Sequence, residues 1–297
     1  MSNPVTEPSP SAAAASPQPA TGSEWLRIGG VALAVRDLMR IEAFYCEVLG
    51  LGVVDRTADT VRLGAGGIAF LELLHRPDAL QDDSATAGLF HTAFLLPSRA
   101  DLGRWLVHAG KLRQLLDGAA DHLVSEALYL SDPEGNGIEV YADRPHAQWR
   151  WRDGPEGRRV EMANQPLDLE SLIAEADTAW AGAPGGMRVG HVHLRVGDIA
   201  EAVRFYGDRL GMDVTAVRPG AAFLSTGGYH HHIAVNAWSS AGAGLREEGR
   251  AGLAWVTLDV ADMQRLAGVA RGSGTANVAE CGLRDPWGTE LRFRLAQ

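Results

Sequence analysis

Residues 28–53 read IGGVALAVRDLMRIEAFYCEVLGLGV, and residues 189–214 read VGHVHLRVGDIAEAVRFYGDRLGMDV. The two stretches align without a gap. Each begins with alternating apolar residues, passes an aspartate that can cap a helix, and continues with a helical apolar period that ends in Phe-Tyr and Leu-Gly. This repeat predicts a strand, a helix and a glycine stop in both halves of the chain.

Two shorter segments extend the repeat. Residues 88–106 (GLFHTAFLLPSRADLGRWL) and 252–270 (GLAWVTLDVADMQRLAGVA) each read as a strand followed by a helix. Each half then closes with a DPxG turn that leads into a strand, at Asp132 and at Asp285. The chain therefore contains four strand-helix-strands modules, which we number one to four along the sequence.

The composition excludes several classes of protein. A formal net charge of -10 argues against extended contact with nucleic acid, which needs clustered Lys and Arg. No apolar run approaches the ~20 residues of a spanning helix, and the N-terminus lacks a secretory signal, so we expect a cytoplasmic protein without a membrane partner. The two cysteines, Cys46 and Cys281, favour packed thiols over a metal site, although the sequence leaves a single bridge open.

The chain divides where its composition changes. With 297 residues and 46% hydrophobic content it can form two domains with a large core. Residues 1–24 are rich in Pro, Ala and Ser and lack an apolar period, which is typical of a disordered tail. We expect a first domain over 25–145 (modules one and two), a connector with a short acidic helix over 146–186, and a second domain over 187–297 (modules three and four).

The module pattern resembles the vicinal oxygen chelate superfamily over residues 25–295. The resemblance implies an α+β fold in which four βαβββ modules form two glyoxalase/dioxygenase-like units, with a curved sheet that can cup a metal. It does not by itself decide the function. The superfamily includes dioxygenases, isomerases, lyases and metal-free drug-binding proteins, so the site has to decide.

The superfamily places ligands early on the first strand and on the last strand of a module. From module one to module four, the first-strand place holds Gly30, His91, His191 and Trp255, and the last-strand place holds Glu72, Glu139, Asn236 and Arg292. Only modules two and three offer a metal set, namely His91, Glu139 and His191. Two imidazoles and one carboxylate with open positions suit a non-haem Fe(II) oxygenase, and Mn(II) accepts the same ligands. Pairing of modules two and three is inferred from this chemistry, since adjacent pairing would leave each half with an incomplete set.

Strand phase supports this selection. His191, His193 and Arg195 alternate with apolar residues, and Glu139 and Tyr141 do the same in their own strand. A lone buried histidine is more often hydrogen-bonded structure than a ligand, and a lone strand glutamate is usually solvated. Their joint occurrence at three equivalent places favours the metal set.

Residues 121–139, DHLVSEALYLSDPEGNGIE, add a motif. The order His122, Tyr129, the DPxG turn and Glu139 closely resembles the type I extradiol dioxygenase signature, with Ala120 as one departure from it. Together with GGYHHHIAVNAW at 227–238, it makes the chain similar to the catechol-2,3-dioxygenase-like family.

The resemblance implies a role for each matching residue. Glu139 would bind the metal, Tyr129 would donate a hydrogen bond to the substrate or to oxygen, and His122 would lie over the site. His232 would be the acid–base histidine, since an imidazole with a pKa near 6.5 can accept and return a proton at neutral pH. By strand alternation, His231 faces away from His230 and His232, which predicts a structural role for His231. The roles of His193 and His230 stay open.

The expected function is Fe(II)-dependent extradiol cleavage of a catecholic ring with O2, in aromatic compound catabolism. A glyoxalase-like metal-dependent isomerase or lyase is the alternative, and a non-catalytic small-molecule binding protein is a third. Glyoxalase chemistry generally uses a second carboxylate, where module three has Asn236, and a binding protein would not need histidines and a tyrosine around an open metal position. The substrate and the oligomeric state stay open, although the superfamily commonly forms homo-oligomers. Four aromatic residues can shape a pocket or belong to the core: Phe90, Phe94, Tyr141 and Trp238.

Overall fold

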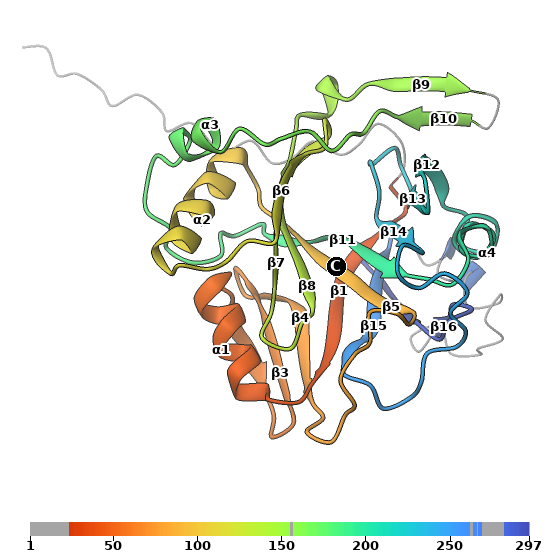
Figure 1. Cartoon of the computed structure of the whole chain (residues 1–297), viewed down its shortest axis with the longest axis horizontal. Helices are drawn as coiled ribbons and strands as arrows, with labels where there is room; N and C mark the ends of the chain where they lie inside the picture. The colour runs from red at the N-terminus through yellow and green to blue at the C-terminus, as the bar shows by residue number, and fades with distance from the viewer. Residues whose placement is uncertain (1–23, 155–156, 262–263, 266, 269–281, 297) are drawn as a thin grey trace, which may run out of the picture.

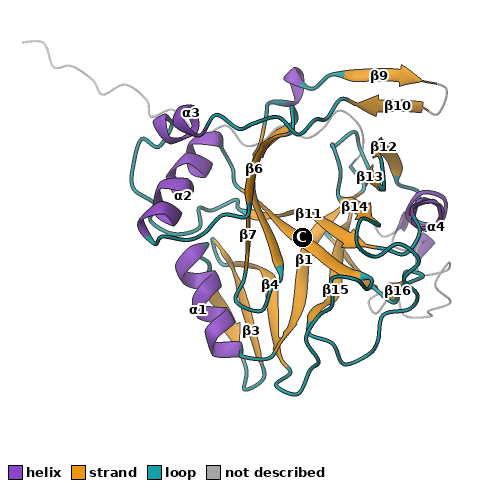
Figure 2. Cartoon of the chain, viewed as in Figure 1, coloured by secondary structure: helices purple, strands orange, loops and turns teal. Residues whose placement is uncertain are grey.

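The computed structural model describes residues 24–154, 157–261, 264–265, 267–268 and 282–296. In this part of the chain the protein has the expected α+β fold, with two curled β-sheets and few helices (Figure 1, Figure 2). The tail expected over residues 1–24 lies outside the described residues apart from Glu24. The second cysteine, Cys281, also lies outside them, and Cys46 is a free thiol.

In modules one to three, a first strand is followed by a helix and three more strands, as the repeat predicts. Module one contains β1 (Leu26–Val35), α1 (Leu38–Val48), β2 (Gly52–Arg56), β3 (Thr60–Ala65) and β4 (Ile68–His75). Module two contains β5 (Gly88–Leu95), α2 (Arg99–Lys111), β6 (Gly118–Asp121), β7 (Ser125–Ser131) and β8 (Gly137–Asp143). Module three contains β11 (Arg188–Arg195), α4 (Ile199–Val203) with a π-helical extension η2 (Arg204–Arg209), β12 (Asp213–Arg218), β13 (Ala221–Ser225) and β14 (Ile233–Asn236).

Module four contains β15 (Gly252–Val260), β16 (Gly282–Arg284) and β17 (Glu290–Leu295). The helix expected after β15 lies largely outside the described residues. The connector holds a short 3-10 turn η1 (His146–Gln148), a hairpin of β9 (Trp151–Gly154) and β10 (Gly157–Val160), and the helix α3 (Leu169–Ala174). Sequence periodicity predicted only the helix, because hairpin strands of four residues are too short to show an alternating pattern.

The two sheets combine modules from different halves of the chain. One, here called the 1/4 sheet, has the strand order β16-β17-β15-β1-β4-β3-β2 and joins modules one and four. The other, here called the 2/3 sheet, has the order β12-β13-β14-β11-β5-β8-β7-β6 and joins modules two and three. Each sheet therefore contains strands from both of the expected domains, 25–145 and 187–297. First strands pair antiparallel across the halves, β1 with β15 and β5 with β11.

The repeated aspartates and tyrosines connect modules that are neighbours in sequence. Asp37 and Asp198 cap α1 and α4 by accepting backbone N–H bonds, as the repeat predicts. The buried hydroxyl of Tyr45 donates to Asp132 Oδ2 at 3.3 Å, and that of Tyr206 donates to Asp285 Oδ2 at 2.9 Å. The Phe-Tyr and DPxG motifs thus join module one to two and module three to four.

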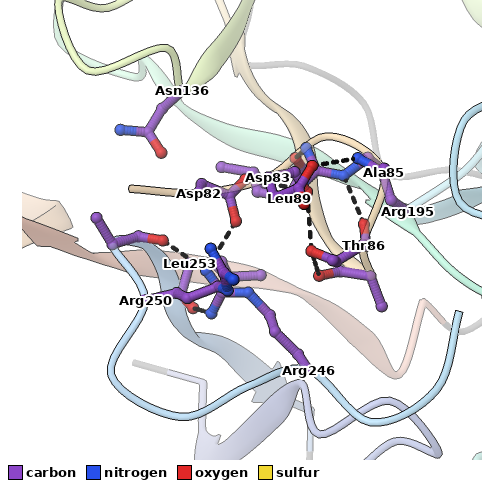
Figure 3. Close-up of polar contacts among 12 residues, drawn as sticks. Asp82, Asp83, Ala85, Thr86, Leu89, Asn136, Arg195, Arg246, Arg250 and Leu253 are labelled. Atoms are coloured by element: carbon purple, nitrogen blue, oxygen red, sulfur yellow. Dashed lines mark hydrogen bonds and ion pairs between the residues drawn. The ribbon is translucent and has the colours of Figure 1, made fainter. Parts of the chain in front are cut away.

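A partly buried cluster of charges joins the two sheets beside β5 (Figure 3). Asp82, from the segment between β4 and β5, accepts hydrogen bonds from Arg195 on β11 at 2.5 Å and from Arg246 at 3.0 Å. Arg195 also donates to the backbone oxygens of Thr86 and Leu89. These contacts anchor the end of β11 that follows the predicted metal ligands.

In the described residues, no helix has the length and apolar character to cross a membrane.

Candidate metal centre

Three adjacent strands bring the predicted ligands together. His91 lies on β5, Glu139 on β8 and His191 on β11, and β5 is the central strand of the three. Glu139 Oε2 is 3.0 Å from His91 Nε2 and 3.2 Å from His191 Nε2. One donor atom from each side chain lies within 4.8 Å of the other two, and all three side chains are buried. We refer to these residues as the triad.

The donor set of the triad fits a divalent transition metal. His91 Nε2 is buried and has no hydrogen-bond partner in the part of the chain that the structure describes, although it faces Glu139. A buried nitrogen without a partner is costly, and a cation between the three donor atoms would engage it. His191 Nδ1 is also buried without a partner, so ring packing against Tyr141, with 4.9 Å between centroids, orients this imidazole.

The protonation states of Glu139 and His191 suit metal binding. Burial alone would raise the pKa of Glu139, but the adjacent imidazoles of His191 and His91 hold it well below its ordinary value. Burial lowers the pKa of His191 to about 4, against the opposing effect of Glu139. At neutral pH the triad therefore offers one carboxylate and a neutral His191 imidazole, and metal binding has no proton to displace from either.

Tyr129 lies beside His91 of the triad, and His122 lies beside Tyr129. Tyr129 is the partner of Glu139 across β7 and β8, and its ring centroid is 5.6 Å from that of His91. His122 Nδ1 donates to the Ala163 carbonyl at 2.9 Å, so its Nε2 accepts from the Tyr129 hydroxyl at 2.6 Å. Burial, followed by the Glu139 charge, raises the pKa of Tyr129 well above its ordinary value, so this hydroxyl keeps its proton.

The structure does not bring His232 to the triad. Its Nε2 is 2.8 Å from Glu24 Oε1, and its Nδ1 is 3.0 Å from the Ser225 hydroxyl. Among the described residues, no hydrogen bond or ring contact joins it to His91, Glu139 or His191. Both ring nitrogens of His232 are occupied by groups outside the triad.

His231 takes the place beside the triad instead. Its ring centroid lies 4.1 Å from that of His191, and its Nδ1 is 2.7 Å from His230 Nδ1. Strand alternation assigned the phase of these histidines wrongly, because β14 begins only at Ile233 and residues 230–232 precede it. The Gly-Gly pair at 227–228, with positive φ at both residues, is the sequence signal that a turn interrupts the strand there.

The two histidines whose roles stayed open have clear partners. Residues 230–232 are here called the histidine turn. His230 Nε2 lies 2.9 Å from Asp143 Oδ1, and this contact holds the histidine turn against β8. His193 Nε2 accepts from the Asn236 amide at 3.0 Å, and the His193 ring packs 4.9 Å from that of His91. Both rings also lie beside the triad, His193 next to His91 and His230 at 6.0 Å from His191 between ring centroids.

The strand register corrects the last-strand place of module three. Glu139 is paired with Ala93, which is two residues after the first-strand place at His91. In module three, the residue two after His191 is His193, and its partner on β14 is Ala234. Ala234, not Asn236, therefore occupies the place of a fourth ligand, because the turn before β14 shifts the register from that of the aligned sequence. Neither residue is a carboxylate.

Comparison with known proteins shows which family the chain matches. The model of the Glyoxalase/Bleomycin resistance protein/Dioxygenase superfamily matches residues 27–140 and 188–293. The chain is 41% identical to a Bacillus subtilis (strain 168) protein named Catechol-2,3-dioxygenase over 252 residues, which cover 82% of this chain and 86% of that one.

Solved structures share the fold at low sequence identity. Glyoxalase I from Zea mays has a TM-score of 0.52 and 17% identity, over 90% of this chain and 92% of that chain. The cppA protein from Streptococcus pneumoniae TIGR4 has a TM-score of 0.53 and 12% identity, over 93% of this chain and 100% of that chain. At these identities the likeness concerns the fold alone.

Proposed function

Because the chain belongs to the Glyoxalase/Bleomycin resistance protein/Dioxygenase superfamily, we propose that it is an Fe(II)-dependent extradiol dioxygenase. Its substrate would be a catecholic ring, opened with O2 next to the two hydroxyls, in aromatic compound catabolism. The observation that carries this proposal is the buried triad of two imidazoles and one carboxylate on three adjacent strands. The relative with 41% identity, named Catechol-2,3-dioxygenase, supports the same reaction class.

His91, His191 and Glu139 would hold Fe(II), and Mn(II) suits the same ligands. When bound, the ion supplies Lewis acidity, which lowers the cost of removing a proton from a catechol hydroxyl. The protein keeps water away from this chemistry, since all three side chains are buried. Burial also strengthens the electrostatic effect of the single negative charge of Glu139 on the centre.

The residues around the triad would bind the substrate and handle its proton. His231 Nδ1 is engaged with His230, which leaves Nε2 as the atom that can accept a proton from a hydroxyl of the substrate. The ring of His231 adjoins His191, so a substrate bound at the metal would lie near His231. We assign the acid–base role to His231 and a structural role to His232, which reverses the assignment from the sequence.

Tyr129 would orient the substrate from the opposite side of the triad. Its hydroxyl is held by His122, whose other nitrogen is fixed by the Ala163 carbonyl. This chain of hydrogen bonds gives the phenol one orientation before substrate arrives, and such preorganisation lowers the entropic cost of a productive geometry. A glyoxalase-like function has less support, since Ala234 and Asn236 supply no second carboxylate on β14.

Anaerobic reconstitution with Fe(II), followed by oxygen and a panel of catechols, tests the proposal. We expect oxygen uptake that matches the formation of a yellow ring-opened product, and no activity in the Glu139→Ala protein. Fully loaded wild-type protein that consumes no oxygen with any catechol, yet isomerises a thiohemiacetal substrate, would replace this function with the glyoxalase-like alternative.

A further inference from the structure

Two exposed aromatic rings lie together beside the triad. Among the large apolar side chains that are exposed in the described part of the chain, only Phe90 and Trp238 are aromatic, with 39% and 54% of their surface exposed. Their ring centroids are 5.4 Å apart. Single exposed apolar residues are normal on protein surfaces, but paired aromatic rings that stay in water point to a contact surface.

A β-bulge turns Phe90 toward the ligands of the triad. In the β5–β11 ladder, His91 pairs with His193 and Leu89 pairs with Leu194, so Phe90 is the extra residue between two pairs. Regular alternation would place Phe90 on the face opposite His91. Instead, its ring centroid lies 5.3 Å from that of His91 and 4.9 Å from that of His193. Bulges next to active sites commonly re-aim a side chain in this way.

The 1/4 sheet provides an internal comparison for this bulge. Trp255 pairs with Ala32 and Leu253 pairs with Leu33, so Ala254 is skipped at the position equivalent to Phe90. The bulge is therefore a property of the repeated fold. The aromatic side chain on it occurs only in the sheet that carries the triad, and packing of the common fold does not require it.

Trp238 is fixed at the end of β14 with more than half of its surface exposed. Its indole N–H donates to the Pro219 carbonyl at 3.1 Å, and its ring centroid lies 5.5 Å from that of His193. Gly220 gives the indole its space, since a Cβ there would lie 3.0 Å from Trp238 Cδ1. The buried His193 ring thus lies between Trp238 and His91, whereas Phe90 contacts His91 directly.

We infer that Phe90 and Trp238 form an aromatic rim that selects catechols bearing a second planar, apolar group. The inference rests on the proposed function, because it assumes that the catechol oxygens sit at the triad. The rings of Phe90 and Trp238 meet at 76°, so a planar substituent can stack on one and meet the edge of the other. A catechol without a substituent has no second ring that could stack on the rim.

Anaerobic binding tests this rim without any turnover. The Mn(II)-loaded full chain is titrated by calorimetry with catechol, 3-phenylcatechol and 4-phenylcatechol. We expect the wild type to prefer one phenylcatechol, and Phe90→Ala and Trp238→Ala each to reduce that preference by about tenfold, the effect of losing one well-placed aromatic contact. The affinity for unsubstituted catechol should change by less than about twofold, since the rim does not touch it.

Two control variants make the result specific. Phe90→Leu keeps an apolar side chain on the bulge and should retain part of the preference. Leu115→Ala removes a side chain that is 82% exposed on the loop before β6, and it should change no affinity. Circular dichroism checks that each variant is folded, as we expect for side chains this exposed.

The outcomes separate the rim from the proposed function. If the wild type shows no preference, or if neither aromatic variant changes it, the rim is wrong even when the protein consumes oxygen with catechols. If phenylcatechols bind with the expected preference but Fe(II)-loaded protein consumes no oxygen, the dioxygenase function is wrong and the rim stands. Failure of all three catechols to bind would overturn both.

Discussion

The 2/3 sheet and the 1/4 sheet have equivalent strands and different chemistry at the same places. Where the 2/3 sheet has His91, Glu139 and His191, the 1/4 sheet has Trp255, Arg292 and Gly30. The guanidinium of Arg292 lies 3.4 Å from the centroid of the Trp255 ring, a cation–π contact within the same pair of strands. The two sheets thus share the same strand positions, and the side chains at three of these positions determine whether a sheet has a set of metal ligands.

Placing the side chains of the triad at the equivalent positions of the 1/4 sheet would not be enough to make a metal site there. A Cβ atom at Gly30 would lie 2.7 Å from the carbonyl oxygen of Phe70, so a histidine there would force β1 and β4 apart. In the 1/4 sheet, the backbone of β4 at Phe70 occupies the space that a side chain at Gly30 would need. The comparison leads to four predictions, which we order from the largest expected effect to the smallest.

The largest effect is expected when one ligand of the triad is removed. Glu139→Ala should abolish stoichiometric Fe(II) or Mn(II) binding, because it removes the only carboxylate of the triad and leaves two imidazoles as ligands. Glu72→Ala, on β4 of the 1/4 sheet, is the matched control and should keep its metal. Metal content after dialysis, measured by mass spectrometry, gives the answer. A Glu139→Ala protein that retains a full complement of metal would remove the basis of the comparison.

The second prediction compares His231 and His232 as candidates for the acid–base role. His231→Gln should lower turnover by on the order of 100-fold, the usual contribution of a positioned acid–base group, and should leave metal content and anaerobic catechol binding intact. His232→Gln should lower turnover by less than about tenfold, since His232 acts only through the turn that carries His231. Steady-state kinetics on a good substrate compares the two. Equal losses in both variants would contradict our assignment.

The third prediction concerns a feature that the two halves of the chain share. Tyr206→Phe should lower the free energy of unfolding by about 1–3 kcal/mol, because it leaves a buried oxygen of Asp285 without its donor. Tyr45→Phe should cost less, since Asp132 Oδ2 also accepts from the Asn136 amide at 2.8 Å. Denaturant unfolding of the metal-free proteins measures both.

The loss in the Tyr206→Phe protein should depend on pH. Burial raises the pKa of Asp285 above its ordinary value, and the Tyr206 hydroxyl opposes this rise by stabilising the ionised form. Removing the hydroxyl therefore raises the folded-state pKa further, and the deficit in stability is full above that pKa and shrinks as the pH falls through it. A deficit that grows toward acid pH would show that Asp285 is not the partner that matters.

The smallest effect is expected at Glu24, where the start of the described chain meets the histidine turn. Glu24→Gln keeps a hydrogen-bond acceptor for His232 and loses only the charge of a partly exposed carboxylate, so stability should fall by less than about 1 kcal/mol. Turnover should stay within about twofold of the wild type, because the His231 ring stays beside His191. A loss of turnover as large as that of His231→Gln would return the acid–base role to His232.

Much of the molecule was predictable from local patterns. The strand and helix of the repeat, the capping aspartates and the DPxG turns depend on residue spacing over short stretches, whereas the three places of the triad were inferred from the resemblance to the superfamily. Local sequence carries that information because side-chain periodicity and capping act over one or two turns or strand pairs. The superfamily and its α+β fold followed from the same patterns, and both are confirmed.

The ligand chemistry suggested that modules two and three combine, and the tertiary structure has this pairing and decided which side chains meet. The pairing of β5 with β11 joins residues about one hundred positions apart, and no local pattern states which first strands will share a ladder. The phases of His231 and Phe90 depend on a turn and a bulge, each of which shifts the alternation by one residue and moves a side chain to the other face. The sequence by itself determined which side chains this protein has that could bind a metal or a substrate. The hydrogen-bond register between distant strands decided which of them face one another, because that register is set by the whole sheet and not by any single strand.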